Sequence, residues 1–262
     1  MQDQTFNVTG PVRLDLRIPH ADVTVATGPA GAATVSFGAG GRNADDVNVT
    51  CERRGETDVV TVSSKTSGLF RSRRPVAVDV RLPESSAVSV STAAGGVVCT
   101  GPLGAVRVET ASAGVRIPEA ASADVVGVSG EVSIGRVAGE ASVKTVSGAI
   151  EVDDVRGRLV LRTVSGRIRV RGAGGDVEAR SVSGDVALQR LEQGVVRLDS
   201  VSGDVSLGVR RGVAVWLDLD SASGHVRSDL GAAPDVPSDG RPVLELRGRT
   251  VSGDLRVTPV EV

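Results

Sequence analysis

The chain has 262 residues, of which 40% are hydrophobic but only 2% are aromatic, and its formal net charge is −2. With so few aromatic rings, valine, isoleucine, leucine and alanine must fill the core, which suits a thin interior between two nearby walls. The balanced charge gives no whole-chain argument for binding nucleic acid or an anionic membrane. No apolar run approaches the roughly 18 residues that a membrane-spanning helix needs.

The N-terminal segment shows no export signal. Residues 1–4 contain no basic residue, and Asp15, Arg17 and His20 interrupt the first apolar stretch. This pattern differs from that of a secretory signal peptide. For the sequence as written, we therefore expect a cytoplasmic protein.

The first 90 residues predict strands without a regular repeat. Aliphatic and polar residues alternate over residues 12–18 and again over residues 76–82, which is typical of strands with one buried face. A stack of strands must hide its first edge, or it will pair with other chains. We therefore interpret residues 1–90 as an irregular β cap that starts a solenoid.

One segment of this cap, residues 65–75, breaks the strand pattern because an aromatic residue stands among cations. Such a combination is typical of a contact with a partner or an anionic surface. The alternative is that Phe70 folds back into the cap while the basic side chains stay solvated. The candidate partner-binding residues are Leu69, Phe70, Arg71, Arg73 and Arg74.

The two cysteines, Cys51 and Cys99, each continue a strand alternation. Two cysteines do not make a disulfide framework. We expect both to be buried, reduced thiols.

From residue 129 to residue 191 the sequence repeats every nine residues. The fourth and sixth positions of each unit are aliphatic and share one face of a short strand, because side chains alternate with period two. The ninth position is also aliphatic, and we expect it to point inward at a bend. The second position is always glycine, which permits a turn that a Cβ would obstruct: Gly130, Gly139, Gly148, Gly157, Gly166, Gly175 and Gly184.

A second period of 18 residues lies on the first, because only alternate units contain the element Thr/Ser-Val-Ser-Gly. Two different corners per 18 residues predict a coil of two strands and two turns, with successive coils stacked about 4.8 Å apart. The predicted fold is an all-β, single-domain parallel β-solenoid, or β-helix. We expect its coils to be right-handed, as most parallel crossovers are.

Residues 18 apart should be neighbours on adjacent coils, so Ile150 should lie beside Ile168. Opposite charges then meet across coils, and each such pair stabilises paired strands by about 0.2–1 kcal/mol. The expected pairs are Glu151 with Arg169, Asp153 with Arg171, and Arg167 with Asp185. A column of like charge also forms, indicating either an anion site or solvated side chains: Lys144, Arg162 and Arg180.

The solenoid repeats are predicted over residues 91–262, loosely at first. Residues 229–242, with three prolines and two glycines, predict a loop that protrudes from the coils. Residues 243–262 then resume the pattern and predict a final coil. Because only Pro259 and Glu261 guard its last strand, we expect an open edge there.

Residues suited to catalysis or metal binding are scarce. The only histidines are His20 and His225, and no strand–turn–helix nucleophile elbow occurs. Calcium-binding β-rolls also repeat every nine residues, but Arg158 and Arg167 stand where acidic ligands would be needed. No glycine-rich segment leads into a predicted helix that could hold phosphate. We predict no catalytic, cofactor-binding or metal-binding residues and no small-molecule substrate.

The elements Ser181–Val186 and Ser200–Val205 resemble a bacterial family of unknown function labelled "putative adhesin". Residues 10–16 followed by residues 22–25 are also similar to that family, and the resemblance covers nearly the whole chain. It implies a β-solenoid without catalytic residues, and some members are associated with cell-envelope stress responses. The chain departs from an adhesin in showing no export signal or anchor.

Three functions remain open. The favoured one is a non-catalytic binding or scaffold module that presents its sheet faces to a protein partner, since the repeat carries no site chemistry. The second is a structural protein that stacks end to end, as bactofilin-type solenoids do. The third is a carbohydrate-active β-helix enzyme, which the near absence of aromatic platforms disfavours. Nucleic acid is not expected as a partner, and no membrane-spanning segment is expected.

Overall fold

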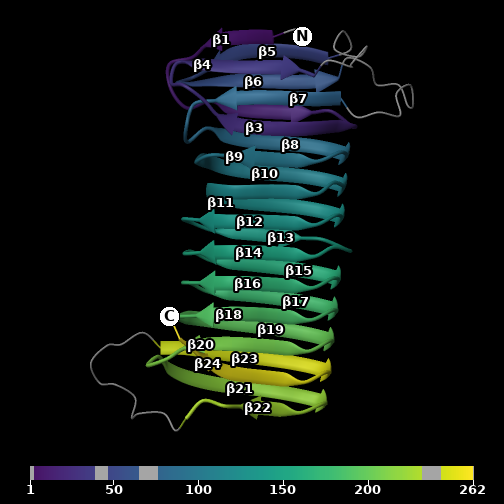
Figure 1. The fold of residues 1–262 in the computed structure, drawn as a ribbon, viewed down its shortest axis with the longest axis vertical. Coiled ribbons are helices and arrows are strands. Elements are labelled where there is room, and N and C mark those ends of the chain that lie inside the picture. Colours follow the sequence, from purple (N-terminus) through teal and green to yellow (C-terminus); the bar gives the residue numbers. More distant parts are fainter. Residues whose placement is uncertain (1–2, 39–46, 65–75, 232–242, 262) are drawn as a thin grey trace. The chain divides into compact units, whose positions relative to one another are not determined.

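A computed structural model describes residues 3–38, 47–64, 76–231 and 243–261. Their secondary structure consists of strands throughout, with no helix in these ranges (Figure 1). The chain divides into two compact units, residues 1–134 and 135–262. The candidate partner-binding residues Leu69, Phe70, Arg71, Arg73 and Arg74 lie outside the described ranges, so that loop stays a prediction.

The first unit begins with mixed pairing and continues with parallel pairing. Its strands are β1 (Asp3–Asn7), β2 (Arg13–Arg17), β3 (Ala21–Thr27), β4 (Ala32–Phe37), β5 (Val47–Arg54), β6 (Thr57–Ser64), β7 (Val76–Leu82), β8 (Ala87–Ala94), β9 (Val97–Thr100), β10 (Leu103–Ser112) and β11 (Val115–Ser129), and β12 (Val132–Val137) crosses the unit boundary. Strands β1, β4 and β7 pair antiparallel, as do β5 and β6. Strand β2 lies between β6 and β8, and β3 between β7 and β9, all in parallel. This insertion and reversal explain why no nine-residue repeat can be read in the segment.

The second unit is a regular stack of parallel strands. They are β13 (Ala141–Lys144), β14 (Ile150–Val155), β15 (Leu159–Ser165), β16 (Ile168–Ala173), β17 (Val177–Ser183), β18 (Val186–Leu191), β19 (Gly194–Ser202), β20 (Val205–Arg210), β21 (Ala214–Ser223), β22 (Val226–Ser228), β23 (Val243–Ser252) and β24 (Leu255–Val260). Odd-numbered strands pair with odd-numbered strands and even with even, so each coil contributes one strand to each of two walls (Figure 1).

The predicted 18-residue register is confirmed. Ile150 pairs with Ile168, and Ile168 pairs with Val186 on the following coil. Leu159 and Leu161, two inward positions of β15, are fully buried. The parallel β-solenoid expected from the repeat is therefore the fold of this chain. The handedness of the coils stays a prediction.

The ninth position of the repeat behaves differently at the two corners. Val155 and Leu191 are buried, as predicted, whereas Val146, Val164 and Val182 are exposed, so the prediction was wrong for them. The reason is that β15 and the other strands of its wall continue the alternation of inward and outward side chains into the corner. The hydroxyl residue takes the inward position there, and the next residue faces outward. The exposed column forms what we call the valine stripe: Val146, Val164, Val182, Val201 and Val251.

The glycine of the Thr/Ser-Val-Ser-Gly corner is required for two reasons, which Gly184 illustrates. Its φ is +134°, a conformation that L side chains rarely adopt. A Cβ at this position would also lie 2.4 Å from the carbonyl oxygen of Gly166 on the preceding coil. Close stacking of the coils at this corner therefore depends on glycine.

The order of the last two coils in space differs from their order in the sequence. Strand β23 lies between β19 and β21, and β24 lies between β20 and β22. The prediction that residues 243–262 form the open last coil was therefore wrong, and Leu255 and Val257 are buried. The coil of β21 and β22 ends the stack instead. Its second strand is shorter, and the polar Ser228 takes an inward position there, whereas Val257 takes the equivalent position in β24. The coil of β21 and β22 therefore suits an end better than the coil of β23 and β24 does.

Candidate binding surfaces

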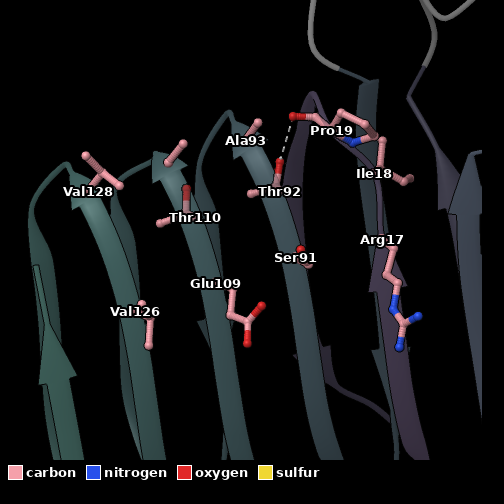
Figure 2. A pocket seen from close by; sticks show the side chains of 11 residues that line it. Arg17, Ile18, Pro19, Ser91, Thr92, Ala93, Glu109, Thr110, Val126 and Val128 are labelled. Atoms are coloured by element: carbon pink, nitrogen blue, oxygen red, sulfur yellow. Dashed lines mark hydrogen bonds between the residues drawn. The ribbon is translucent and has the colours of Figure 1, made fainter. Parts of the chain in front are cut away.

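An open groove of 520 Å³ crosses the corner of the first unit (Figure 2). Outward side chains from β2, β8, β10 and β11 line one side of it, among them Arg17, Glu109 and Val126. Thr92 lies nearer the core and donates a hydrogen bond to the carbonyl of Pro19 at 3.4 Å, as Figure 2 shows. The lining combines one guanidinium and one carboxylate with small and aliphatic groups, which suits a contact surface.

A second groove, of 360 Å³, runs along the valine stripe of the second unit. Val164, Val182 and Val201 line one side of it. The predicted like-charge column forms the other side, since Lys144 pairs with Arg162 and Arg162 with Arg180 in the strand register. The groove thus joins an apolar row to a basic row across four strands.

The basic row is partly neutralised by Glu178 on β17. Its carboxylate accepts a hydrogen bond from Arg162 at 2.9 Å and lies within 3.3 Å of Arg158 and 3.4 Å of Arg180. The Arg162 hydrogen bond is the main reason that the pKa of Glu178 is lowered, although burial opposes it. Asp199 lies 3.4 Å from Arg180. The groove is therefore mixed in charge, which favours solvated, ion-paired arginines over a dedicated anion site.

The predicted charge pairs across coils form in part. Arg171 lies 3.1 Å from Asp153, as expected. Glu151 and Arg169 are neighbours in the register. A further pair that the repeat did not predict joins Arg158 to Glu178 at 3.3 Å.

The first residue of each Thr/Ser-Val-Ser-Gly corner carries a hydroxyl group that points inward. This hydroxyl hydrogen-bonds to the corner backbone on some coils and not on others. Ser181 donates to the carbonyl of Gly184 at 3.4 Å, and Ser221 to that of Gly253 at 3.0 Å. Thr163 and Ser200 are also buried, but their hydroxyls have no hydrogen-bond partner among the described residues. Both line the floor of the second groove.

The cysteines and His225 stand apart from both grooves. Cys99 is fully buried, which raises the pKa of its thiol to about 12, while Cys51 is half-buried with a pKa raised by burial and by Asp58. Both are free thiols. His225 is exposed, with its Nδ1 3.4 Å from a carboxylate oxygen of Asp254. The amide of His225 donates to the same oxygen and is the main cause of the lowered pKa of Asp254.

Within the described ranges, no group of three or more histidine, cysteine, aspartate or glutamate side chains could hold a metal ion. The same residues contain no helix long and apolar enough to cross a membrane.

Two surfaces were missed by the sequence analysis. One is the valine stripe, whose members were expected to point inward. The other is the end of the second unit, where Trp216, Leu217 and Val226 are exposed. The guanidinium of Arg247 lies 5.4 Å from the centroid of the Trp216 ring. A tryptophan in a chain with few aromatic residues was the available signal for this surface.

The family model named Toastrack DUF4097 matches residues 12–258, nearly the whole chain. The chain belongs to the Toastrack family. The resemblance inferred from the Thr/Ser-Val-Ser-Gly-Asp-Val elements is thereby confirmed. No curated protein matches the sequence.

Several solved structures resemble this chain at low sequence identity. One is a "putative adhesin" from Bacteroides fragilis, with 14% identity and a TM-score of 0.51 over 98% of this chain and 96% of that chain. Another, a "putative lipid binding protein" from Parabacteroides distasonis, has 12% identity and a TM-score of 0.46 over 98% and 96%. A third, a "putative adhesin" from Parabacteroides merdae, has 9% identity and a TM-score of 0.42 over 98% and 95%. At 14% identity, the likeness to the Bacteroides fragilis structure shows the fold alone.

Proposed function

We propose that this Toastrack chain is a non-catalytic binding module that docks a protein partner along the valine stripe. The observation that carries the proposal is the stripe itself. Its five valines lie in register on successive coils and are between 44% and 54% exposed. Single exposed valines are ordinary on a protein surface, but a contiguous apolar row marks an interaction site.

The surroundings of the stripe support a protein interface. Lys144, Arg162, Arg180 and Asp199 border the apolar row with charge, and an apolar centre with a polar rim is the usual arrangement of an interface. Because each coil repeats the same chemistry, a partner that runs along the stack can make the same contact several times.

Repetition also favours binding over catalysis. A catalytic site needs one environment that differs from all others, with a nucleophile, a base and a stabilising group in contact. The Thr/Ser-Val-Ser-Gly corner instead recurs with the same geometry on successive coils. The adhesin description of the Bacteroides fragilis structure agrees with a binding role.

The test compares stripe variants with an exposed valine elsewhere. Proteins captured from cells by the wild-type chain are purified, and their affinities are measured for V164D, V182D and the control V98D, since Val98 is exposed outside the stripe. A charge in an apolar contact should weaken binding about tenfold or more, which is about 1.4 kcal/mol. V98D should bind as the wild type does.

All three variants should keep the wild-type far-UV circular dichroism spectrum, because the substituted side chains are exposed. The proposal fails if no partner distinguishes V164D and V182D from V98D. It also fails if the purified chain turns over a glycan or an ester and loses that activity through one point mutation.

A further inference from the structure

Within the residues that the structure describes, the second unit ends in an open strand edge. Among the described strands, β21 pairs only with β23 and β22 only with β24. By contrast, β23 and β24 have partners on both sides. β21 is ten residues long, which is a long edge to leave unpaired.

The backbone groups at this edge can be assigned from the pairing in the rest of the stack. Residues whose side chains point into the core donate their backbone amides to the neighbouring coil on the side of the stack where β21 and β22 lie. Leu159 donates to Asp176 at 2.8 Å, and Leu255 donates to His225 at 2.9 Å. By the same rule, the inward residues Leu217 and Leu219 of β21 direct their amides to the open end. These groups can hydrogen-bond to one further strand.

The side chains at the edge are those of an interrupted core. Leu217 lies in the same column as Leu246 and Val196, which are fully buried, yet it is itself 36% exposed. Val226 on the second wall pairs with the buried Leu255 and is itself exposed, while Trp216, on the outward face of β21, is 50% exposed. One more strand would bury the exposed face of Leu217, at about 25 cal/mol per Å² of apolar area.

The charges on β21 indicate which strand would fit. Asp218 and Asp220 point outward and form no ion pair with the described residues. On its paired side, β21 faces Arg247 and Arg249 of β23 in the register. The neighbour that β21 already accepts thus combines aliphatic inward residues with arginines beside the two aspartates.

We propose that the open edge of β21 binds an extended segment of a partner protein by strand addition. The segment would alternate aliphatic residues with two basic residues that lie beside Asp218 and Asp220. A second copy of this chain fits less well, because pairing β21 with β21 would bring these carboxylates close to one another. This site is separate from the valine stripe and does not depend on it.

The test uses Trp216, the only tryptophan of the chain, as a fluorescent reporter. The probe is a short acetylated and amidated peptide in which leucine alternates with arginine, and its partner probe replaces each arginine with aspartate. The wild-type chain should bind the arginine peptide with one-to-one stoichiometry and a change in Trp216 emission. The double variant D218R/D220R should bind this peptide at least roughly tenfold more weakly and should bind the aspartate peptide instead.

The substituted aspartates are exposed, so the variant should fold, and V98D, at an exposed valine outside both surfaces, serves as a control that should bind the arginine peptide as the wild type does. Equal affinity of both peptides for the wild-type chain would overturn the proposal, as would a Trp216 emission that neither peptide changes. Sedimentation without peptide measures the oligomeric state of the chain. A dimer in which Trp216 emission shows a buried ring would assign the edge to self-pairing and would also overturn the proposal.

Discussion

Gly184 shows how strongly a single backbone position limits a coil. We expect G184A to lower the free energy of unfolding by about 2–4 kcal/mol. A positive φ costs an L residue about 1–2 kcal/mol, and the new Cβ would meet the Gly166 carbonyl at 2.4 Å. G212A is the matched control, because Gly212 has a φ of +82° but no atom within 4 Å of its would-be Cβ. G212A should lower the free energy of unfolding by only the roughly 1–2 kcal/mol that a positive φ costs an L residue.

Urea unfolding followed by far-UV circular dichroism measures both losses. If G184A and G212A were equally destabilised, close stacking at the Ser-Gly corner would contribute nothing, and the account of the corner would be wrong.

The same residue scale shows what the repeat could predict. Glycine spacing identified the corners because their geometry excludes a Cβ. The outward position of Val164 was missed because periodicity alone cannot say how far a strand's alternation continues into a corner.

Glu178 acts at the scale of neighbouring strands, because it joins Arg162 of β15, and Arg158 just before that strand, to its own strand β17. The folded chain lowers the pKa of this carboxyl. Stability from Glu178 should therefore be fully present above the unfolded pKa of about 4.3. It should be lost as the pH falls through the lower, folded pKa.

We expect E178Q to be less stable than the wild type by up to about 1 kcal/mol at neutral pH, since the arginines are exposed to solvent. The difference should disappear in acid, and unfolding curves between pH 7 and pH 3 would show it. E151Q is the control, because Glu151 forms no ion pair within the described ranges. A difference that stayed constant with pH would mean that packing, and not charge, accounts for the role of Glu178.

Strand register was predictable from the sequence, whereas the order of strands was not. Ile150 meets Ile168 because a slip by one residue would turn every inward side chain to water. The cap strands β2 and β3 and the coil of β23 and β24 are inserted between earlier strands. Every coil presents similar aliphatic columns to its neighbours, so the repeat alone cannot select which neighbour it receives. The same ambiguity concealed the open edge of β21.

At the scale of the molecule, the inserted coil predicts an unusual pattern of hydrogen exchange. Strands β23 and β24 are near the C-terminus of the chain, where fraying is normally greatest. They are nevertheless paired on both sides, and Leu246, Leu255 and Val257 are buried. Their amides should exchange at least roughly tenfold more slowly than those of β21 and β22, because an edge coil opens locally at lower cost.

Native-state exchange of the full chain, resolved by peptide mass spectrometry, compares residues 244–258 with residues 214–228. Strands β15 and β16, which are paired on both sides within the second unit, provide the reference for an interior coil. Faster exchange in residues 244–258 than in residues 214–228 would contradict the insertion and with it the edge on β21. Slow exchange in residues 244–258 would mean that the last strands of the sequence are held in the interior of the stack, leaving the earlier coil to form the end that a partner can extend.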